Sequence, residues 1–423
     1  MKIAGVIAEY NPFHNGHYYQ LEQIKQKTGA DYIVVVMSGD FLQRGVPALT
    51  DKYARTKMAL SAGADLVIEL PCVWATASAE YFAQAGVRLL QKMGNVTHLC
   101  FGAECDDLDL LLSISSLLSR EDAAYQKFLS HNLKKGLSFP AARSQALSSA
   151  IENDPDLSRK LPEITLLLAS PNNILALEYL KALQQTSSDP KTITPVLIPR
   201  KGDGYHTPDI HSTLASATAI RKALFAGQCT QELSSLMPET TLQILDAYQK
   251  EFPFLDENSP SQMLAYRLFS FSEKDYDCFA DCSHGLSNRI RNQLGQYQNI
   301  GQFTSLLKTK EITYSRISRA LIHILLDIRN SDYDLGQSMD WIPYLRILGF
   351  RKSAGALLSD MKKEASVPFI TKVADASTLL ASDAYSFFKK DLFAADLYRQ
   401  LMIANGAPLP KNEFTQGLIL IDS

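Results

Sequence analysis

Two histidines near the start of the chain, His14 and His17, enclose a glycine, Gly16. An apolar run over residues 2–8 precedes them and a helical pattern over residues 15–27 follows, so both imidazoles should lie in a first helical turn. A helix N-terminus offers unpaired N–H groups to a polyphosphate, and glycine allows its close approach. The imidazoles could then donate hydrogen bonds to phosphate oxygens as charge shifts toward a leaving pyrophosphate. On these residues alone, a helix start with two surface histidines remains an alternative.

A second candidate phosphate-binding element lies some two hundred residues later, in the stretch ASATAIR that ends at Arg221. Ser216 and Thr218 fall at a predicted helix start, where hydroxyls and a guanidinium one turn on can grip phosphate oxygens. An ordinary N-cap with a surface arginine is the alternative. Together the two elements resemble the paired signatures of the nucleotidyltransferase superfamily. The usual form of the second, ISSTxIR, is altered here by Ala215 and Ala217.

Strands and helices alternate through the first hundred residues. The apolar run at residues 33–36 is β-branched throughout, which suits a strand buried on both faces of a parallel sheet. Glycine and proline end several of the segments. The pattern predicts strands at 2–8, 31–37, 65–70 and 97–101, with helices at 15–27, 52–62 and 79–92.

The rest of the chain is read mainly as helix. Residues 105–185 have helical periodicity and look like an insertion, after which 194–199 supplies one more strand and a loop rich in Gly, Asp and His leads to a helix near Ala217. We expect the α/β core to close there. Strand signals are rare beyond Gly227, so we place a boundary near residue 230. The expected fold is α/β: a Rossmann-like ATP-binding domain with a parallel sheet (1–230), followed by a mostly helical region (231–423).

Further polar residues fall at the predicted carboxyl edge of the sheet, where open α/β sheets bind ligands. Asp40 and Arg44 follow the second strand, and Gly102 ends the fourth. Loop capping and a surface salt bridge are the alternative for Asp40 and Arg44.

Residues 285–320 hold a local excess of positive charge, with Glu311 as the single acid and Tyr297 and Tyr314 among the cations. A basic surface with aromatic side chains suits phosphates and unpaired bases, although a solvated helix face is the alternative. The six cations are Arg289, Arg291, Lys308, Lys310, Arg316 and Arg319.

Composition limits the class of protein. The 423 residues carry a formal net charge of −3, which excludes coating of nucleic acid by bulk charge but permits a local basic patch. Six scattered cysteines lack the CxxC pairs of a zinc site, and neither a signal peptide nor a membrane-length apolar run is evident. We expect a soluble, cytoplasmic protein with reduced thiols, no dedicated metal ligands and no obligate protein partner.

Four longer stretches resemble the bacterial tRNA(Met) cytidine acetate ligase family: AEYNPFHNGH, VMSGDFLQRGVPA, SPNNILALEYLKAL and ASATAIRKAL. The resemblance continues into GLSNRI and TKEITYSRISRALIHILLDI, so it covers most of the chain. It implies acetylation of N4 of the wobble cytidine of elongator tRNA(Met), with acetate and ATP as substrates. It also implies ATP contacts from residues 7–20, Gly102, an asparagine of the Asn172–Asn173 pair and Arg200. A helix cap after Pro171 is the alternative for the asparagine pair.

We therefore assign candidate roles by residue. The catalytic candidates are His14, His17, Asp40 and Arg221. The ATP-binding candidates are Ile7, Ala8, Glu9, Tyr10, Asn11, Pro12, Phe13, Asn15, Gly16, Gln20, Gly102, Asn172, Asn173, Arg200, Ser216 and Thr218. The resemblance implies that the helical region 231–423 binds tRNA, and the tRNA-binding candidates there are Arg289, Arg291, Lys308, Lys310, Arg316 and Arg319.

Three other functions stay open on the sequence alone. A small-molecule adenylyltransferase would use the same histidine chemistry but leave AMP on its product, and a catalytically silent RNA-binding protein would not need the paired phosphate motifs. A class I aminoacyl-tRNA synthetase would need a KMSKS-like loop, and Lys308-Thr309-Lys310 matches that motif only weakly. We expect magnesium to accompany ATP, held mainly by phosphates and water.

Overall fold

The computed structural model describes residues 1–120, 123–151, 155–185, 193–200, 216–271 and 275–422. The expected loop rich in Gly, Asp and His, together with Ala215, lies outside the described residues.

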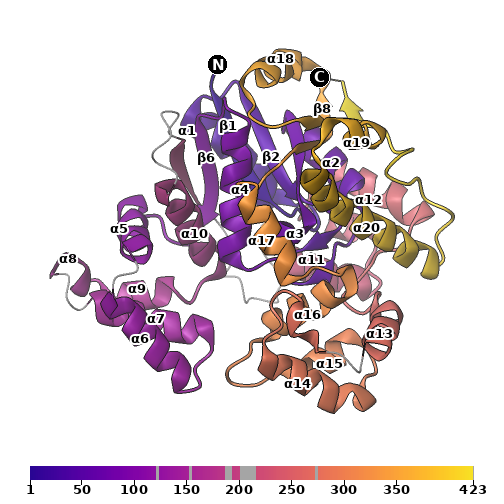
Figure 1. The fold of residues 1–423 in the computed structure, drawn as a ribbon. Helices are drawn as coiled ribbons and strands as arrows, with labels where there is room; N and C mark the ends of the chain where they lie inside the picture. The colour runs from indigo at the N-terminus through magenta and orange to yellow at the C-terminus, as the bar shows by residue number, and fades with distance from the viewer. Residues whose placement is uncertain (121–122, 152–154, 186–192, 201–215, 272–274, 423) are drawn as a thin grey trace.

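One sheet with the strand order β10-β8-β5-β2-β1-β6-β7 forms the centre of the molecule (Figure 1). Five strands of this sheet come from the first two hundred residues and are mutually parallel, as the sequence predicts. They are β1 (Ile3–Ala8), β2 (Tyr32–Ser38), β5 (Leu66–Leu70), β6 (His98–Ala103) and β7 (Thr194–Pro199).

Helices cover both faces of this sheet, because alternate side chains of each strand enter different cores. Val34 and Val36 share one core with α4 (Ala79–Lys92), α5 (Leu108–Arg120) and α10 (Pro171–Gln185). Ile33, Val35 and Met37 share the other with the remaining helices of this region. These are α1 (Asn15–Thr28), α2 (Lys52–Ser61), α11 (Ala217–Phe225) and α12 (Glu239–Glu251). The doubly wound prediction is confirmed.

The expectation that the sheet ends with residues 194–199 is wrong. β8 (Leu345–Arg351) pairs antiparallel with β5, and β9 (Phe369–Ile370) and β10 (Ile419–Ile421) pair with β8. The pairing partner of β8 lies almost three hundred residues earlier in the chain, so no local pattern indicates it. A division near residue 230 stays a prediction, and the strands after it complete the N-terminal sheet.

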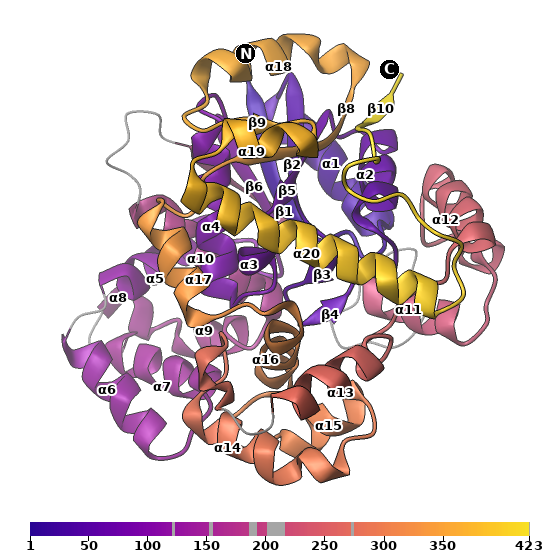
Figure 2. The ribbon, with the colours of Figure 1, turned by 45° about the vertical axis from the view of Figure 1, so that its right-hand side comes forward.

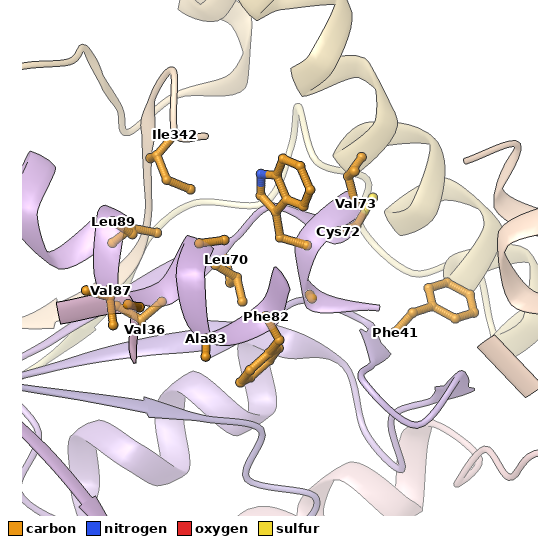
Figure 3. Close-up of a cluster of buried hydrophobic side chains, with 14 of the residues drawn as sticks. Val36, Phe41, Leu70, Cys72, Val73, Phe82, Ala83, Val87, Leu89 and Ile342 are labelled. Carbon is orange, nitrogen blue, oxygen red and sulfur yellow. The ribbon is translucent and has the colours of Figure 1, made fainter. Parts of the chain in front are cut away.

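C-terminal elements also pack on the N-terminal core. Figure 3 shows Ile342, from the segment before β8, near Leu89 of α4 and Leu70 of β5, and all three belong to one buried cluster. The long helix α20 (Ser382–Ala404) crosses the same side of the sheet (Figure 2) and adds Phe387 to that cluster.

Two helical groups lie on the side of the sheet away from the N-terminus (Figures 1 and 2). The first is the expected insertion, with α6 (Ala123–Lys134), α7 (Phe139–Ile151), α8 (Pro155–Ser158) and α9 (Leu161–Leu167) after α5. The second comprises α13 (Ser261–Ser270), α14 (His284–Gln293), α15 (Ile300–Leu307) and α16 (Tyr314–Leu326).

Short elements complete the chain: β3 (Phe41–Leu42), β4 (Val46–Pro47), α3 (Cys72–Ala75), α17 (Asn330–Ser338), α18 (Gly355–Glu364) and α19 (Ala376–Leu379). Among the described residues, no helix combines the length and the apolar character that a bilayer crossing requires.

Candidate active site

The turn between β1 and α1 holds the two histidines in a reciprocal cap. The Gly16 N–H donates to His14 Nδ1 over 3.0 Å, and the His14 N–H donates to His17 Nδ1 over 3.3 Å. The two rings stack with centroids 3.8 Å apart. A Cβ at Gly16 would lie 2.8 Å from His14 Cε1, so any side chain there would displace the imidazole.

Both imidazoles are neutral at pH 7. Burial lowers the pKa of His14 to about 3, helped by the positive charges of Arg200 and Arg221. Burial, His14 and Arg200 hold the pKa of His17 well below its usual value. Since Nδ1 of each ring accepts a backbone N–H, the proton of each neutral ring resides on Nε2. The turn therefore presents two adjacent Nε2–H donors.

The second motif contacts the first directly. Arg221, on α11, donates to the Asn11 carbonyl oxygen over 2.6 Å, across 210 residues of sequence, and to Thr218 Oγ1 over 3.2 Å. Ser216 caps α11 by accepting from the Ala219 N–H. Its hydroxyl is therefore engaged at the helix start, and the guanidinium of Arg221 is brought beside the histidine turn.

Other predicted ATP-binding residues meet at the end of β6. A Cβ at Gly102 would lie 3.4 Å from Arg200 Cγ and 3.7 Å from Gln20 Nε2. Strand β6, helix α1 and the residue after β7 thus converge at the carboxyl edge where the sequence predicts a nucleotide.

The asparagine pair lies at the start of α10 and supports the loop after β6. Asn173 is buried, and its Oδ1 accepts from the N–H groups of Glu104 and Cys105 over 2.9 Å each. Asn172 Nδ2 donates to Glu104 Oε1 over 2.6 Å. The two asparagines shape this loop, and direct contact with ATP stays a prediction.

Asp40 lies in a buried ionic cluster. Its Oδ1 accepts from the Lys52 N–H over 2.8 Å, and Lys52 Nζ lies 2.9 Å from Glu69 and 3.0 Å from Glu413. Burial raises the pKa of Asp40 to about 6, against the positive charges of Lys52 and Arg55. Within the described chain, no hydrogen bond joins Asp40 to the histidine turn, so a catalytic role for it stays a prediction.

Arg55 is a site-shaping residue that the sequence analysis missed. Its guanidinium is fully buried and donates to the carbonyl oxygens of Glu9, Ser38 and Gly39. It therefore fixes the ends of β1 and β2 at the carboxyl edge of the sheet, where the sequence predicts a nucleotide. The available signal was an arginine on the apolar side of a predicted helix, next to Met58 and Ala59.

The predicted basic patch contains arginines that bond to neighbouring parts of the protein and lysines that face the solvent. Arg289 donates to the carbonyl oxygens of Leu306 and Leu307, which end α15. Arg319 pairs with the Asp281 carboxylate and Arg291 with that of Asp275, whereas Arg316 donates to the backbone carbonyl oxygen of Asp281. Both acids precede residue 285, so the charge excess counted over 285–320 overstates the patch.

Lys308 and Lys310 are exposed and line a hollow of about 840 Å³. Its other lining residues are Ser305, Thr309, Thr313, Tyr314 and Ser315. The two lysines are the members of the predicted patch that remain available to a ligand.

A mostly parallel sheet with helices on both faces, and a capped histidine–glycine turn after its first strand, define a nucleotidyltransferase of the HIGH type. The chain matches the HIGH Nucleotidyl Transferase family over residues 1–412. It belongs to the tRNA(Met) cytidine acetate ligase family, which confirms the resemblance noted in its sequence.

Relatives match along essentially the whole chain. The tRNA(Met) cytidine acetate ligase of Acetivibrio thermocellus is 38% identical over 430 residues, covering 100% of both chains. That of a Thermoanaerobacter species is 40% identical over 399 residues, covering 94% of this chain and 95% of the relative.

Two crystal structures of Thermotoga maritima TmcAL share the fold over 100% of both chains. The apo form has a TM-score of 0.92 at 30% identity. The form bound with alpha-thio ATP has a TM-score of 0.89 at 29% identity.

Proposed function

We propose that this protein is an ATP-dependent ligase that activates acetate as acetyl-adenylate and acetylates N4 of the wobble cytidine of elongator tRNA(Met). The observation that carries the proposal is the pair of neutral Nε2–H donors at the start of α1, with Arg221 tied to the same turn. The names of its relatives and the alpha-thio ATP bound by the Thermotoga protein support it.

The triphosphate of ATP is assigned to the space between the histidine turn and the start of α11. His14 and His17 donate to phosphate oxygens, and the helix N-terminus adds N–H groups and a partial positive charge. Arg221 places a guanidinium where the leaving pyrophosphate gains negative charge. We assign Gly102, Gln20 and Arg200 to the border of the nucleotide at the end of β6, and we assign a further contact with it to Asn172 at the start of α10.

The first chemical step joins acetate to AMP. A carboxylate oxygen of acetate attacks the α-phosphorus, a P–O bond forms, and the bond to the β-phosphate breaks to release pyrophosphate. In the second step the N4 amine of cytidine attacks the acetyl carbonyl. A C–N bond forms, AMP leaves with the electrons of the broken C–O bond, and N4 loses a proton.

Magnesium accompanies ATP in this proposal and neutralises phosphate charge when bound. Among the residues that the structure describes, no three His, Cys, Asp or Glu side chains gather to hold a metal. We assign the ion mainly to the phosphates and water rather than to a protein cage.

The partial reactions test the proposal. With ATP, magnesium and labelled pyrophosphate, the ligase exchanges label into ATP when acetate is added, and AMP accumulates when elongator tRNA(Met) is also present. Exchange without acetate, or AMP that remains attached to a small-molecule product, would contradict the ligase and favour the small-molecule adenylyltransferase.

A further inference from the structure

Helix α6 of the insertion carries a row of basic side chains on its outer face. Lys127, His131 and Lys134 are exposed and follow one another at intervals of four and three residues, which places them on one face of the helix. Tyr125 and Asn132, on the opposite face, are buried. The packing of α6 therefore leaves the basic face to the solvent.

The lysines of this row differ from other cations of the insertion. Arg143 pairs with Glu178, Lys160 with Asp107 and Lys181 with Glu80. In the described ranges, no carboxylate forms an ion pair with Lys127, Lys134 or the next residue, Lys135. Their charges are thus available to an external anion.

The end of α6 lies beside the loop that carries Lys308 and Lys310. A Cβ at Gly136, just after α6, would lie 3.0 Å from Glu311 Oε1, so the α6–α7 turn touches the loop between α15 and α16. Figures 1 and 2 show both elements on the side of the sheet away from the N-terminus. The parallel strands point their carboxyl ends, and hence the histidine turn, to that side.

We propose that α6 and the 308–310 loop form one RNA-binding surface, with α6 holding the phosphate backbone of the tRNA beside the active site. The inference rests on the proposed function, because that function requires a polyanionic RNA to reach the histidine turn. Unpaired lysines bind phosphates as point charges without reading sequence. Phe128, 41% exposed next to Lys127, offers an aromatic face to an unpaired base. Glu311 places one acid at the junction, where the surrounding lysines outnumber it.

A matched pair of double variants tests this surface in the full-length protein. Lys134→Glu/Lys135→Glu reverses two exposed charges at the end of α6, and Lys362→Glu/Lys363→Glu does the same in the last turn of α18, at the N-terminal end of the molecule. Filter binding of elongator tRNA(Met) at several salt concentrations gives Kd and its salt dependence. Acetate-dependent ATP–pyrophosphate exchange without RNA monitors the folded nucleotide site.

The α6 variant should raise Kd about tenfold or more and lower the slope of log Kd against log salt by about one to two, one unit for each lost phosphate contact. Its ATP–pyrophosphate exchange activity should match the wild type, and so should the tRNA affinity and exchange activity of the α18 variant. Equal tRNA affinity in the two variants would overturn the proposed surface.

If the α6 double variant loses exchange activity, the single variant Lys127→Glu, far from the α6–α7 turn, is tested instead. The same binding assay then shows whether α6 contributes to tRNA affinity. A wild type that lacks acetate-dependent exchange would instead refute the proposed function, and the binding comparison would still decide the role of α6.

Discussion

At the level of single residues, the proposed reaction depends on the hydrogen bonds that the histidine turn can donate. The backbone N–H groups of His14 and Gly16 occupy Nδ1 of His17 and His14, and burial keeps both rings neutral. In the proposed mechanism, chemistry at the phosphates therefore uses Nε2–H hydrogen bonds, not imidazolium charge. Positive charge comes from Arg221 and Arg200.

Replacing His14 by asparagine distinguishes its two roles, which are to cap the N-terminus of α1 and to donate a hydrogen bond from Nε2–H. Asparagine is a good N-cap, so His14→Asn should unfold at nearly the same urea concentration as the wild type. The loss of one donor aimed at developing charge should lower acetate-dependent exchange by about 10²–10³-fold. His284→Asn, at the exposed start of α14, is the control and should leave exchange unchanged. Full activity in His14→Asn would show that this imidazole does not act on the phosphates.

The neutral state of His14 has a measurable pH signature. Its pKa falls from 6.5 in the unfolded chain to about 3 in the folded protein. The unfolded state thus binds the proton more readily, and this histidine makes folding stability fall as pH drops from about 6.5 toward 3. Hydrogen exchange at C2 of His14, followed by mass spectrometry across pH, should give a midpoint near 3 in native protein and near 6.5 in urea. A native midpoint near 6.5 would contradict the neutral-donor mechanism.

At the scale of elements, contacts between distant segments hold the site loop. Gly45, in the turn between β3 and β4, packs on the backbone of α16, and Ser318 Oγ donates to its carbonyl oxygen over 2.8 Å. Its φ of +73° lies in the left-handed region that favours glycine. This loop connects β2 with α2, so α16 helps to position the carboxyl edge of the sheet.

Gly45→Ala should destabilise the protein by about 3 kcal/mol or more. The new Cβ would lie 2.4 Å from the Arg319 backbone nitrogen, which adds a backbone clash to the strain of left-handed alanine. Gly227→Ala has a similar φ of +89° and open space around the new Cβ, so it should cost only about 1 kcal/mol. Urea unfolding compares the two variants. Equal losses would show that Gly45 does not pack tightly against α16.

The sequence predicted elements whose ends are determined locally and missed those determined by distant partners. α1 ends at Gly29 in the left-handed conformation and β5 ends before Pro71, both visible in the sequence. β8 was missed because β5 is its partner. In the site, the spacing of His14 and His17 was informative, whereas the role of Arg55 arises only when the ends of β1 and β2 converge.

At the scale of the whole molecule, a buried ionic cluster joins the two ends of the chain. Lys52 of α2, 1% exposed, contacts Glu69 of β5 and Glu413 of the C-terminal tail. Arg346 of β8 lies 3.7 Å from Glu413, and Tyr53 donates to the same carboxylate. The C-terminal region therefore completes the nucleotide-binding half both by its strands and by its charges.

Lys52→Met should destabilise the protein by about 3–5 kcal/mol, because it leaves Glu69 and Glu413 buried with only Arg346 to balance them. Lys57→Met, on the exposed side of the same helix, should change stability by less than about 0.5 kcal/mol. Urea unfolding followed by circular dichroism measures both. Similar stabilities for the two variants would mean that the cluster does not hold the halves together.

The most direct test of the central claim is transfer of labelled acetate to RNA. Purified protein is incubated with ATP, magnesium, labelled acetate and either elongator or initiator tRNA(Met), and the digested RNA is analysed for N4-acetylcytidine. We expect label in elongator tRNA(Met) alone, and we expect His17→Ala to abolish it. Unlabelled RNA, together with adenylylation of another acceptor, would contradict the proposed function.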